Sequence, residues 1–358
     1  MNETVTMIKE LSDAFGASGF EEDVVALARK YTRDLDLSFK VDHMNNVIMQ
    51  RPAKEGLPTV MLDAHSDEVS FMIQAIRENG TLDFLTLGGF DPKTLSASKV
   101  VVRTRTGKLV SGIISSKPVH FQTAEDRTSL PAVDKMVIDV GATSKKEAME
   151  DYGIHVGDPA VPGVTLEEKP ETGLLMGKAF DCRIGVAVVI EALKRLNGKP
   201  LTVNLTGTLT SQEEVGERGA QAAVAEVNPD LAIMIEGAPA DDTFTPEYKI
   251  QTGIHRGPMV RHMDVSMIAN PRLTGYVIDE AQKAGIPLQE AVRRGGGTNG
   301  KVVHVAPGGV PSVVISVPVR YAHSSYCYIA LDDFENTVDL VCRILTDLDA
   351  ETIGRFSI

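Results

Sequence analysis

The sequence has few cysteines, no apolar run of membrane length and no basic block. Its three cysteines, Cys182, Cys327 and Cys342, are an odd number without CxxC spacing, which argues against a disulfide framework or a zinc ribbon. No apolar stretch approaches the ~20 residues of a membrane span, and the first ten residues lack the basic and apolar regions of a signal peptide. We therefore expect a soluble cytoplasmic protein.

The charge balance is acidic. Lysine and arginine number 36 against 49 aspartates and glutamates, for a formal net charge of −13. No Lys- or Arg-rich stripe is present to follow a phosphate backbone, so we expect neither nucleic acid nor an anionic membrane as a partner. Small molecules or peptides are the expected ligands. The 358 residues, of which 43% are hydrophobic, are typical of a globular chain with room for about two domains at ~150 residues each.

The expected elements begin with helices and end with alternating strands and helices. Apolar positions recur at helical spacing over 4–15 and 21–34, and candidate strands follow over 39–49 and 59–62. Beyond residue 175 the alternation predicts a mostly parallel sheet covered by helices. The helices expected there are 183–196, 218–227, 271–284 and 332–348, and the strands are 201–209, 231–235, 302–305 and 313–319.

Residues 71–165 have a different pattern from the rest of the chain. Short apolar strands are broken there by Gly, Pro, Asn and Asp, and long helical patterns are absent. This spacing is typical of a small β-barrel or sandwich. We therefore predict an α/β fold class, with one helix-covered, mostly parallel sheet domain formed by 1–70 and 166–358 and an all-β, barrel-like domain inserted over 71–165.

Acidic and histidine residues follow five of the expected apolar strands. Because open α/β sheets bind ligands at the carboxyl ends of their strands, these side chains are expected to meet at one edge. Two histidines and several carboxylates form a ligand set that suits Zn²⁺, Co²⁺ or Mn²⁺, and two ions sharing one carboxylate are common in hydrolases. The five segments are Asp63–Glu68, Ala179–Arg183, Thr210–Gly216, Glu236–Gly237 and Arg320–Ser324.

Each segment also has an ordinary structural explanation. His-x-Asp triplets such as His65 to Asp67 are common, and the pair Glu213–Glu214 fits the solvated first turn of a helix. Asp181 fits a helix N-cap. The coincidence of five such segments at strand ends favours a metal site. The glycine-rich run at 295–300 is equally consistent with a flexible loop and with a wall that approaches a substrate closely.

At these positions the chain resembles the M42 metallo-aminopeptidases, a family that includes glutamyl aminopeptidases and the tetrahedral TET peptidases. The resemblance runs nearly end to end, and its motifs occur in the family's order. The motifs are AHSDEV at 64–69, DCRIG at 181–185, QEEVGERGA at 212–220, GGGTN at 295–299 and VRYAHS at 319–324.

The resemblance implies a metal centre with two divalent ions per chain, zinc or cobalt, with manganese as an alternative. By this resemblance His65, Asp181 and Glu236 bind one ion. Asp181, Glu214 and His323 bind the other, so that Asp181 bridges the two.

The resemblance also implies the reaction and the assembly. Glu213 is the implied general base on a metal-bound water, and Asp67 is the implied carboxylate that orients the imidazole of His65. Hydrolysis would remove the N-terminal residue from a peptide. The inserted domain is the implied dimerisation domain, and relatives form homo-oligomers that range from dimers to dodecamers.

Three positions depart from the family's usual residues. Cys182 stands where Asp or Asn follows the bridging aspartate, and Glu236 stands where Asp is usual. Asn299 stands where the glycine loop usually ends in Asp, and this change is expected to remove a charge near the substrate groove. The preferred N-terminal residue stays open, although Arg256 and Arg261 could attract an acidic side chain.

Two other functions stay open beside the aminopeptidase. The first is a metal-binding scaffold that has lost turnover, which the residues at 182 and 236 make plausible. The second is a glycosidase, since some relatives have been labelled endoglucanases. Glycosidases need a carboxylic acid and a carboxylate that flank a sugar, with no obligatory metal.

Overall fold

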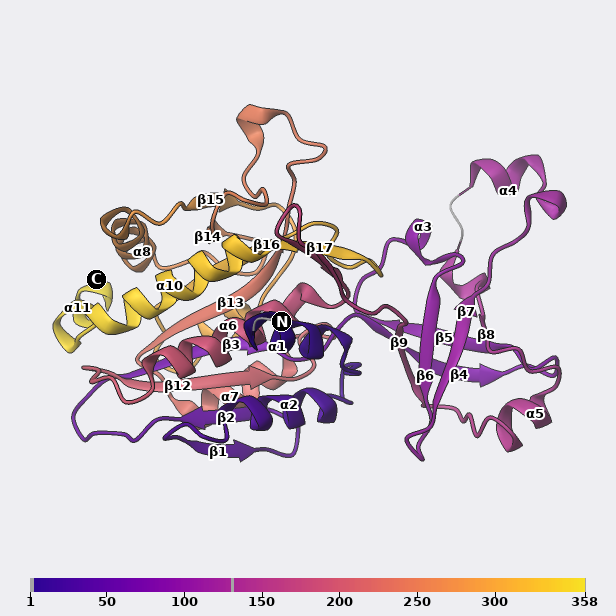
Figure 1. Ribbon diagram of the computed structural model, residues 1–358, viewed down its shortest axis with the longest axis horizontal. Helices are drawn as coiled ribbons and strands as arrows, with labels where there is room; N and C mark the ends of the chain where they lie inside the picture. The colour runs from indigo at the N-terminus through magenta and orange to yellow at the C-terminus, as the bar shows by residue number, and fades with distance from the viewer. Residues whose placement is uncertain (1–2, 130–131, 358) are drawn as a thin grey trace.

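The computed structural model describes residues 3–129 and 132–357 and has two lobes (Figure 1). The larger lobe contains an eight-stranded sheet with helices on both faces, and the smaller lobe is a closed barrel. The predicted α/β fold class with a barrel-like β insertion is therefore confirmed. Within the described ranges, no helix combines the length and the hydropathy that a bilayer crossing requires.

The sheet is parallel at its centre and has antiparallel pairs toward its edges. Its strand order is β1 (Ser38–Val41), β2 (Val47–Gln50), β12 (Asn204–Thr210), β3 (Thr59–His65), β13 (Leu231–Pro239), β16 (Ser312–Val319), β14 (Met259–Met263) and β15 (Gln289–Val292). The four central strands, from β12 to β16, run parallel. Their carboxyl ends therefore lie at one edge.

The central strands are buried on both faces, which explains their uninterrupted apolar sequences. In β3, Val60 and Leu62 belong to the core on one face, and Met61 belongs to the core on the other. The helices of the first face are α1 (Glu3–Asp13), α2 (Glu22–Thr32), α6 (Phe180–Leu196), α8 (Pro271–Ala284) and α10 (Leu331–Asp347), which α11 (Ala350–Gly354) follows; those of the second are α7 (Arg218–Val227) and α9 (Gly300–Val303).

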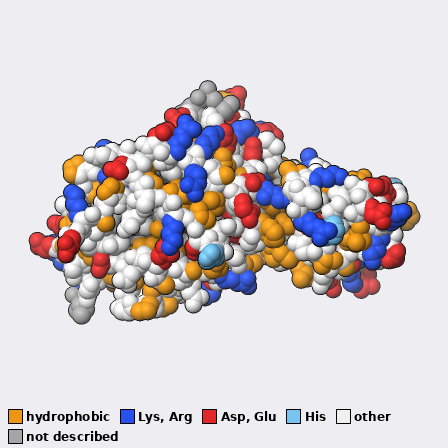
Figure 2. All heavy atoms as spheres, turned by 90° about the horizontal axis from the view of Figure 1, so that it is seen from below, with side chains coloured by type: hydrophobic (Ala, Val, Ile, Leu, Met, Phe, Trp, Pro, Cys, Tyr) orange, Lys and Arg blue, Asp and Glu red, His pale blue; other side chains and the backbone are white. Residues whose placement is uncertain are grey.

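The barrel forms the smaller lobe. Its strands, in order around the barrel, are β4 (Ser70–Ile76), β5 (Leu82–Leu87), β8 (Ile138–Asp139), β7 (Leu109–Ile114), β6 (Lys99–Arg103) and β9 (Pro159–Pro162). Alternate residues such as Val100, Val102 and Val110 fill its interior. Three short helices, α3 (Pro92–Leu95), α4 (Ala124–Thr128) and α5 (Lys145–Glu150), accompany it. On the face in Figure 2, acidic and basic side chains are interspersed over both lobes.

A small antiparallel sheet joins two distant segments of the chain. It consists of β10 (Glu167–Lys169), β11 (Leu174–Gly177) and β17 (Cys327–Ala330). Because β11 leads into Asp181 and β17 follows His323, their pairing draws these two residues toward each other.

Two expected strands differ from the structure. The run 302–305 begins inside α9, so the strand predicted there is wrong; a run this short, three valines and a histidine, carries no periodicity that distinguishes a strand from a helix. The stretch 39–49 is two strands, β1 and β2, rather than one. Its turn is closed by Asp42, whose Oδ1 accepts hydrogen bonds from the backbone N–H groups of Met44 and Asn46.

Candidate active site

His65 and Asp67 lie at the carboxyl end of β3. Both side chains are buried, and His65 Nδ1 lies 3.4 Å from Asp67 Oδ1. The Asp67 carboxylate also accepts hydrogen bonds from the backbone N–H groups of Glu213 and Glu214, at 2.9 and 3.2 Å, and from the Ser18 hydroxyl at 2.6 Å. Asp67 therefore connects the segment after α1, the end of β3 and the loop after β12.

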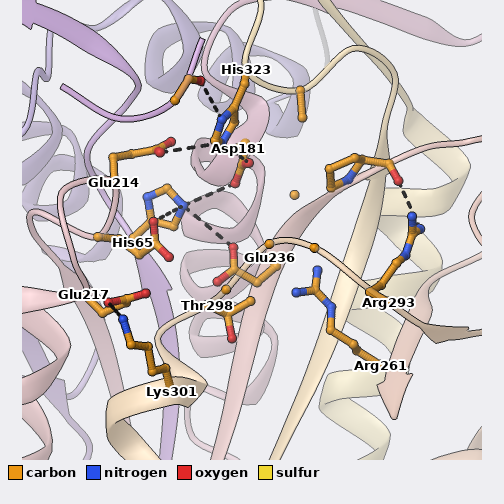
Figure 3. A pocket seen from close by; sticks show the side chains of 18 of the residues that line it. His65, Asp181, Glu214, Glu217, Glu236, Arg261, Arg293, Thr298, Lys301 and His323 are labelled. Carbon is orange, nitrogen blue, oxygen red and sulfur yellow. Dashed lines mark hydrogen bonds and ion pairs between the residues drawn. The ribbon is translucent and has the colours of Figure 1, made fainter. Parts of the chain in front are cut away.

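The Asp181 carboxylate lies between two imidazole rings (Figure 3). Its Oδ1 is 3.2 Å from Nε2 of His65, and its Oδ2 is 3.3 Å from Nε2 of His323. A second carboxylate lies near each ring. Glu236 Oε2 is 3.7 Å from Nε2 of His65, and Glu214 Oε2 is 3.6 Å from Nε2 of His323. Each Nε2 atom thus lies near Asp181 and at least one glutamate, so the Asp181 carboxylate is common to both rings.

Among the residues that the structure describes, three groups of potential ligand atoms lie close enough to share an ion. Within each group, one N, O or S atom per residue lies within 4.8 Å of the others. The first two groups contain the two ligand sets that the family resemblance implies, and the role of these residues as ligands stays a prediction. The groups are His65, Asp181, Cys182 and Glu236; Asp181, Glu214 and His323; and His65, Glu213 and Glu214.

The outer nitrogen of each imidazole is directed away from the shared carboxylate. His323 Nδ1 donates a hydrogen bond to the Gly89 carbonyl oxygen at 2.8 Å, and His65 Nδ1 faces Asp67. Metal-binding histidines commonly have such an outer partner, which fixes the ring and leaves the inner nitrogen free for the ion. Both rings therefore have the orientation that ligation by Nε2 requires.

The carboxylates of the site repel one another in a dry environment. Burial, together with the neighbouring acidic groups, raises the pKa of Glu213 well above its usual value, that of Glu214 to about 8 and that of Glu236 to about 7. Glu214 Oε1 is buried with no hydrogen-bond partner in the described part of the chain. A divalent cation would relieve this repulsion and bind the unpaired oxygen, so the donor set fits metal ions.

Asp181 and His323 have pKa shifts that favour their charged forms. Burial alone would raise the pKa of Asp181, but hydrogen bonds with His323 and His65 hold it below its usual range. Burial likewise opposes the charge on His323, but Asp181 and Glu214 raise its pKa to about 9. Asp181 is therefore an ionised carboxylate at the centre of the site.

Cys182 lies beneath this centre. The peptide bond between Asp181 and Cys182 is cis, and both residues have non-helical dihedral angles at the start of α6. The Cys182 thiol donates a hydrogen bond to the Ile235 carbonyl oxygen, with Sγ 3.1 Å from the oxygen. Burial raises the pKa of the thiol well above its usual value, so Cys182 stays protonated at neutral pH.

The site opens into a pocket of about 660 Å³. Part of its wall is formed by Gly295–Gly297 and Thr298, from the glycine-rich run. Arg261 and Arg293 lie on the side of the pocket opposite His65 (Figure 3). The pocket therefore has an acidic side and a basic side.

The two arginines differ in how their charge is balanced. Arg261 forms an ion pair with Asp264 at 3.0 Å. Arg293 donates to the Pro239 carbonyl oxygen at 3.1 Å and to the Thr252 hydroxyl, and no carboxylate in the described ranges lies within ion-pair distance of it. The buried Nε of each arginine lacks a hydrogen-bond partner among the described residues. Arg293 therefore presents the less compensated charge.

Asn299 does not face the substrate groove, contrary to the expectation from the sequence. Its side chain is buried, and Nδ2 donates hydrogen bonds of 2.7 Å to Asp63 Oδ2 and to the Thr210 hydroxyl. The side chain therefore points into the core beneath the pocket. An aspartate at 299 would place two buried carboxylates in contact, and Asn299 avoids this repulsion.

Several pocket residues escaped the sequence analysis. Glu217 and Lys301 line the pocket as an ion pair at 2.9 Å, and Arg293 and Gly89 also line it. No local pattern identifies them, because each reaches the pocket through tertiary packing. Arg256, which the sequence offered as an attractor of acidic side chains, lies outside the pocket and pairs with Glu247.

The chain is similar to known aminopeptidases along nearly its whole length. The family model described as M42 glutamyl aminopeptidase matches residues 45–340. The glutamyl aminopeptidase of Lactococcus lactis subsp. cremoris is 31% identical over 97% of each chain. The TET aminopeptidase of Thaumarchaeota archaeon SCGC AB-539-E09 superposes with a TM-score of 0.95 at 38% identity, over 99% of this chain and 100% of that one. The TET1 peptidase of Pyrococcus horikoshii, which can assemble into a tetrahedron or a large octahedral shell, is 29% identical with a TM-score of 0.86, over 97% and 100% of the two chains.

Proposed function

The chain belongs to the M42 family of metallo-aminopeptidases, and we propose that it removes the N-terminal residue of peptides with two divalent ions and one general base. The observation that carries this proposal is the convergence of two histidines and three carboxylates, from distant parts of the sequence, on one pocket. These residues are His65, Asp181, Glu214, Glu236 and His323.

We assign the residues to two ions that share Asp181. His65 and Glu236 complete the first set, and Glu214 and His323 complete the second. Zinc or cobalt, with manganese as an alternative, supplies Lewis acidity there that polarises a carbonyl oxygen and lowers the pKa of water. Asp67 holds the His65 ring and the backbone of the Glu213–Glu214 segment in place.

Glu213 is the proposed general base. Its Oε2 lies 4.0 Å from Nε2 of His65, and its side chain lines the pocket. Burial raises its pKa well above the usual value, so the carboxylate can hold a proton that it takes from the attacking water. The same carboxyl group can then donate the proton to the leaving amine of the peptide.

The variant Glu213→Gln tests this assignment. It keeps the shape of the side chain but removes the base, so we expect turnover to fall about 100- to 10,000-fold with both ions retained. Chromogenic amino-acyl substrates with added Co²⁺, Zn²⁺ or Mn²⁺ give the rate, and elemental analysis gives the metal content. The matched control is Glu217→Gln, another pocket carboxylate outside the proposed ligand sets.

Unchanged kinetics in Glu213→Gln would refute the base assignment. A chelator distinguishes the other functions. Loss of peptide hydrolysis on chelation, with recovery on addition of metal, argues against a metal-free glycosidase and against an inactive scaffold. Hydrolysis that persists without metal would contradict the proposed function itself.

We also propose that residues 71–165 form a dimerisation domain and that the chain assembles with copies of itself. The barrel carries exposed apolar side chains, including Leu85, Leu109 and Ile113, which favour contact with another chain. The similar TET1 peptidase, which forms a dodecamer and can assemble into a large octahedral shell, supports a homo-oligomer, and we expect one between a dimer and a dodecamer. Light scattering that gives the mass of a monomer would contradict this proposal.

A further inference from the structure

The barrel lobe reaches the candidate metal centre through the turn Gly88–Gly89. β4 begins at Ser70, three residues after Asp67, and pairs with β5 so that Ser70 lies opposite Leu87. The first residue after β5 is Gly88. The strand pairing therefore carries this glycine turn back to the edge of the sheet, beside the chain that leaves Asp67.

Gly89 contacts His323 through its backbone. The Gly89 carbonyl oxygen accepts the hydrogen bond from His323 Nδ1 at 2.8 Å. His323 has a φ of 60°, a left-handed conformation that is uncommon for residues other than glycine, and its side chain is partly exposed. Among the described residues, the Gly89 carbonyl oxygen in the barrel lobe is the one hydrogen-bond partner of Nδ1, the ring nitrogen of His323 that does not face Asp181.

Gly88 packs against the side chain of Glu214. Its φ is +87°, and a methyl group placed on its Cα would lie 3.0 Å from Glu214 Oε2 and 2.9 Å from Val69 Cγ1. Both separations are shorter than ordinary van der Waals contact. Glycine is therefore required for two reasons: it adopts the left-handed conformation, and it leaves room for the Glu214 carboxylate.

We propose that the Gly88–Gly89 turn is a positioning element for the Glu214 and His323 half of the metal centre. The turn positions the Glu214 side chain by contact with Gly88 and the His323 ring by the hydrogen bond to Gly89. The barrel lobe therefore forms one side of the site that these two residues provide. The other half contains His65, which Asp67 orients from within the sheet lobe. This inference rests on the proposed function, because the ligand roles are assigned there.

The variant Gly88→Ala tests the inference by metal binding rather than by activity. We expect one of the two ions to bind about 10- to 100-fold more weakly, the usual cost of losing an outer partner of a ligand, while the other is unaffected. The matched control is Gly107→Ala, because Gly107 is in the same lobe, has a φ of +84° and has no atom within 4 Å of the added methyl group. Calorimetric titration of the metal-free proteins with Co²⁺, together with elemental analysis after gel filtration, gives the affinity and number of ions.

Selective weakening of one ion in Gly88→Ala, with two ions bound normally by the wild type and by Gly107→Ala, supports the inference. If Gly88→Ala binds two ions normally, the inference is overturned and the proposed function is not. A loss of stability without weaker binding of one ion would show that Gly88 matters only for packing. A wild-type chain that binds fewer than two ions would overturn the proposed function and this inference with it.

A measurement on the wild type keeps the inference testable if Gly88→Ala does not fold. In the zinc-loaded protein, ¹⁵N NMR of the imidazoles shows which nitrogen carries hydrogen, and the spectrum of His323→Gln assigns the signal. The hydrogen bond to Gly89 requires hydrogen on Nδ1 of His323. Hydrogen on Nε2, with Nδ1 as the metal ligand, would overturn the inference.

Discussion

Asp67 organises a pocket that its own side chain does not line. Burial would raise its pKa, but His65, the Ser18 hydroxyl and the Glu213 N–H group stabilise the charged form and hold the pKa below its usual value. An ionised carboxylate accepts stronger hydrogen bonds than a neutral one. Asp67 therefore fixes the orientation of His65 and the path of the backbone at Glu213 at the same time.

At the same scale, Arg293 is expected to select acidic N-terminal residues. Its guanidinium lines the pocket without an ion-pair partner among the described residues, so a substrate carboxylate can supply the missing charge. In Arg293→Ala we expect kcat/KM for a glutamyl substrate to fall about 10- to 100-fold relative to a leucyl substrate, since a hydrogen bond to a charged group contributes about 1.5–3 kcal/mol. Steady-state assays with both substrates check this.

The control for this prediction is Lys301→Ala, because Lys301 lines the same pocket but is already paired with Glu217. It is expected to change the preference between glutamyl and leucyl substrates little. An equal loss for both substrates in Arg293→Ala would show that this arginine supports the fold of the pocket instead of reading the side chain.

The sequence predicted individual site residues where a strand end and a motif coincide. His65 ends β3 and Glu214 follows β12, and the parallel sheet carries both to one edge, whereas Asp181 follows β11 of the small antiparallel sheet. Gly89 and Arg293 could not be found in this way. Their contacts depend on how the barrel and the segment after β15 fold back over the edge of the sheet, and no residue spacing encodes that.

At the scale of elements, three segments meet at one buried ion cluster. Lys178, just after β11, lies 2.5 Å from Glu68, which follows β3, and also donates to the Ala14 carbonyl oxygen after α1. Arg183 of α6 donates to the carbonyl oxygens of Leu11 and Ser66. The cluster therefore fixes α1 and α6 relative to the end of β3 that carries the candidate site.

Removal of one partner from this cluster is expected to destabilise the fold. Lys178→Met leaves Glu68 buried with only the more distant Arg183 as a cation, so we expect a loss of about 3–5 kcal/mol in the free energy of unfolding. Denaturant titration followed by circular dichroism measures it. The control, Lys146→Met, removes an exposed pair with Glu150 and is expected to cost under about 1 kcal/mol. Equal effects from the two variants would contradict the prediction.

Element prediction succeeded where the apolar pattern was long. The helices α7 and α8 match the ranges 218–227 and 271–284, because ten or more residues of apolar spacing define a helical face. The prediction failed at 302–305, where three valines and a histidine carry no such pattern. The split at 39–49 was missed because the hydrogen bonds of Asp42 depend on its side chain, not on periodicity.

At the scale of the whole molecule, the metal-free protein is expected to lose stability as pH rises. Glutamate has an ordinary pKa of 4.5, whereas those of Glu236 and Glu214 are about 7 and about 8; His323 rises from 6.5 to about 9. In each case the folded chain binds more protons than the unfolded chain between the two values. The free energy of unfolding therefore falls as pH increases across this window.

Thermal unfolding in a chelator at about pH 6 and about pH 9 measures this effect, and added Zn²⁺ should restore more stability at the higher pH because binding releases protons. If the metal-free protein is equally stable, or more stable, at the higher pH, the expected fall in the free energy of unfolding is contradicted. The same experiment without a chelator shows how much of the stability of the fold depends on bound metal.

The short connection between Asp67 and β4 has a mechanical consequence. Only Glu68 and Val69 separate the carboxylate that organises the pocket from the first barrel strand, and the returning turn at Gly88 touches the pocket again. The smaller lobe is thus joined to the candidate site by a connection of two residues. A neighbouring molecule that displaced the barrel lobe would therefore also displace the turn that contacts Glu214 and His323 of the candidate site.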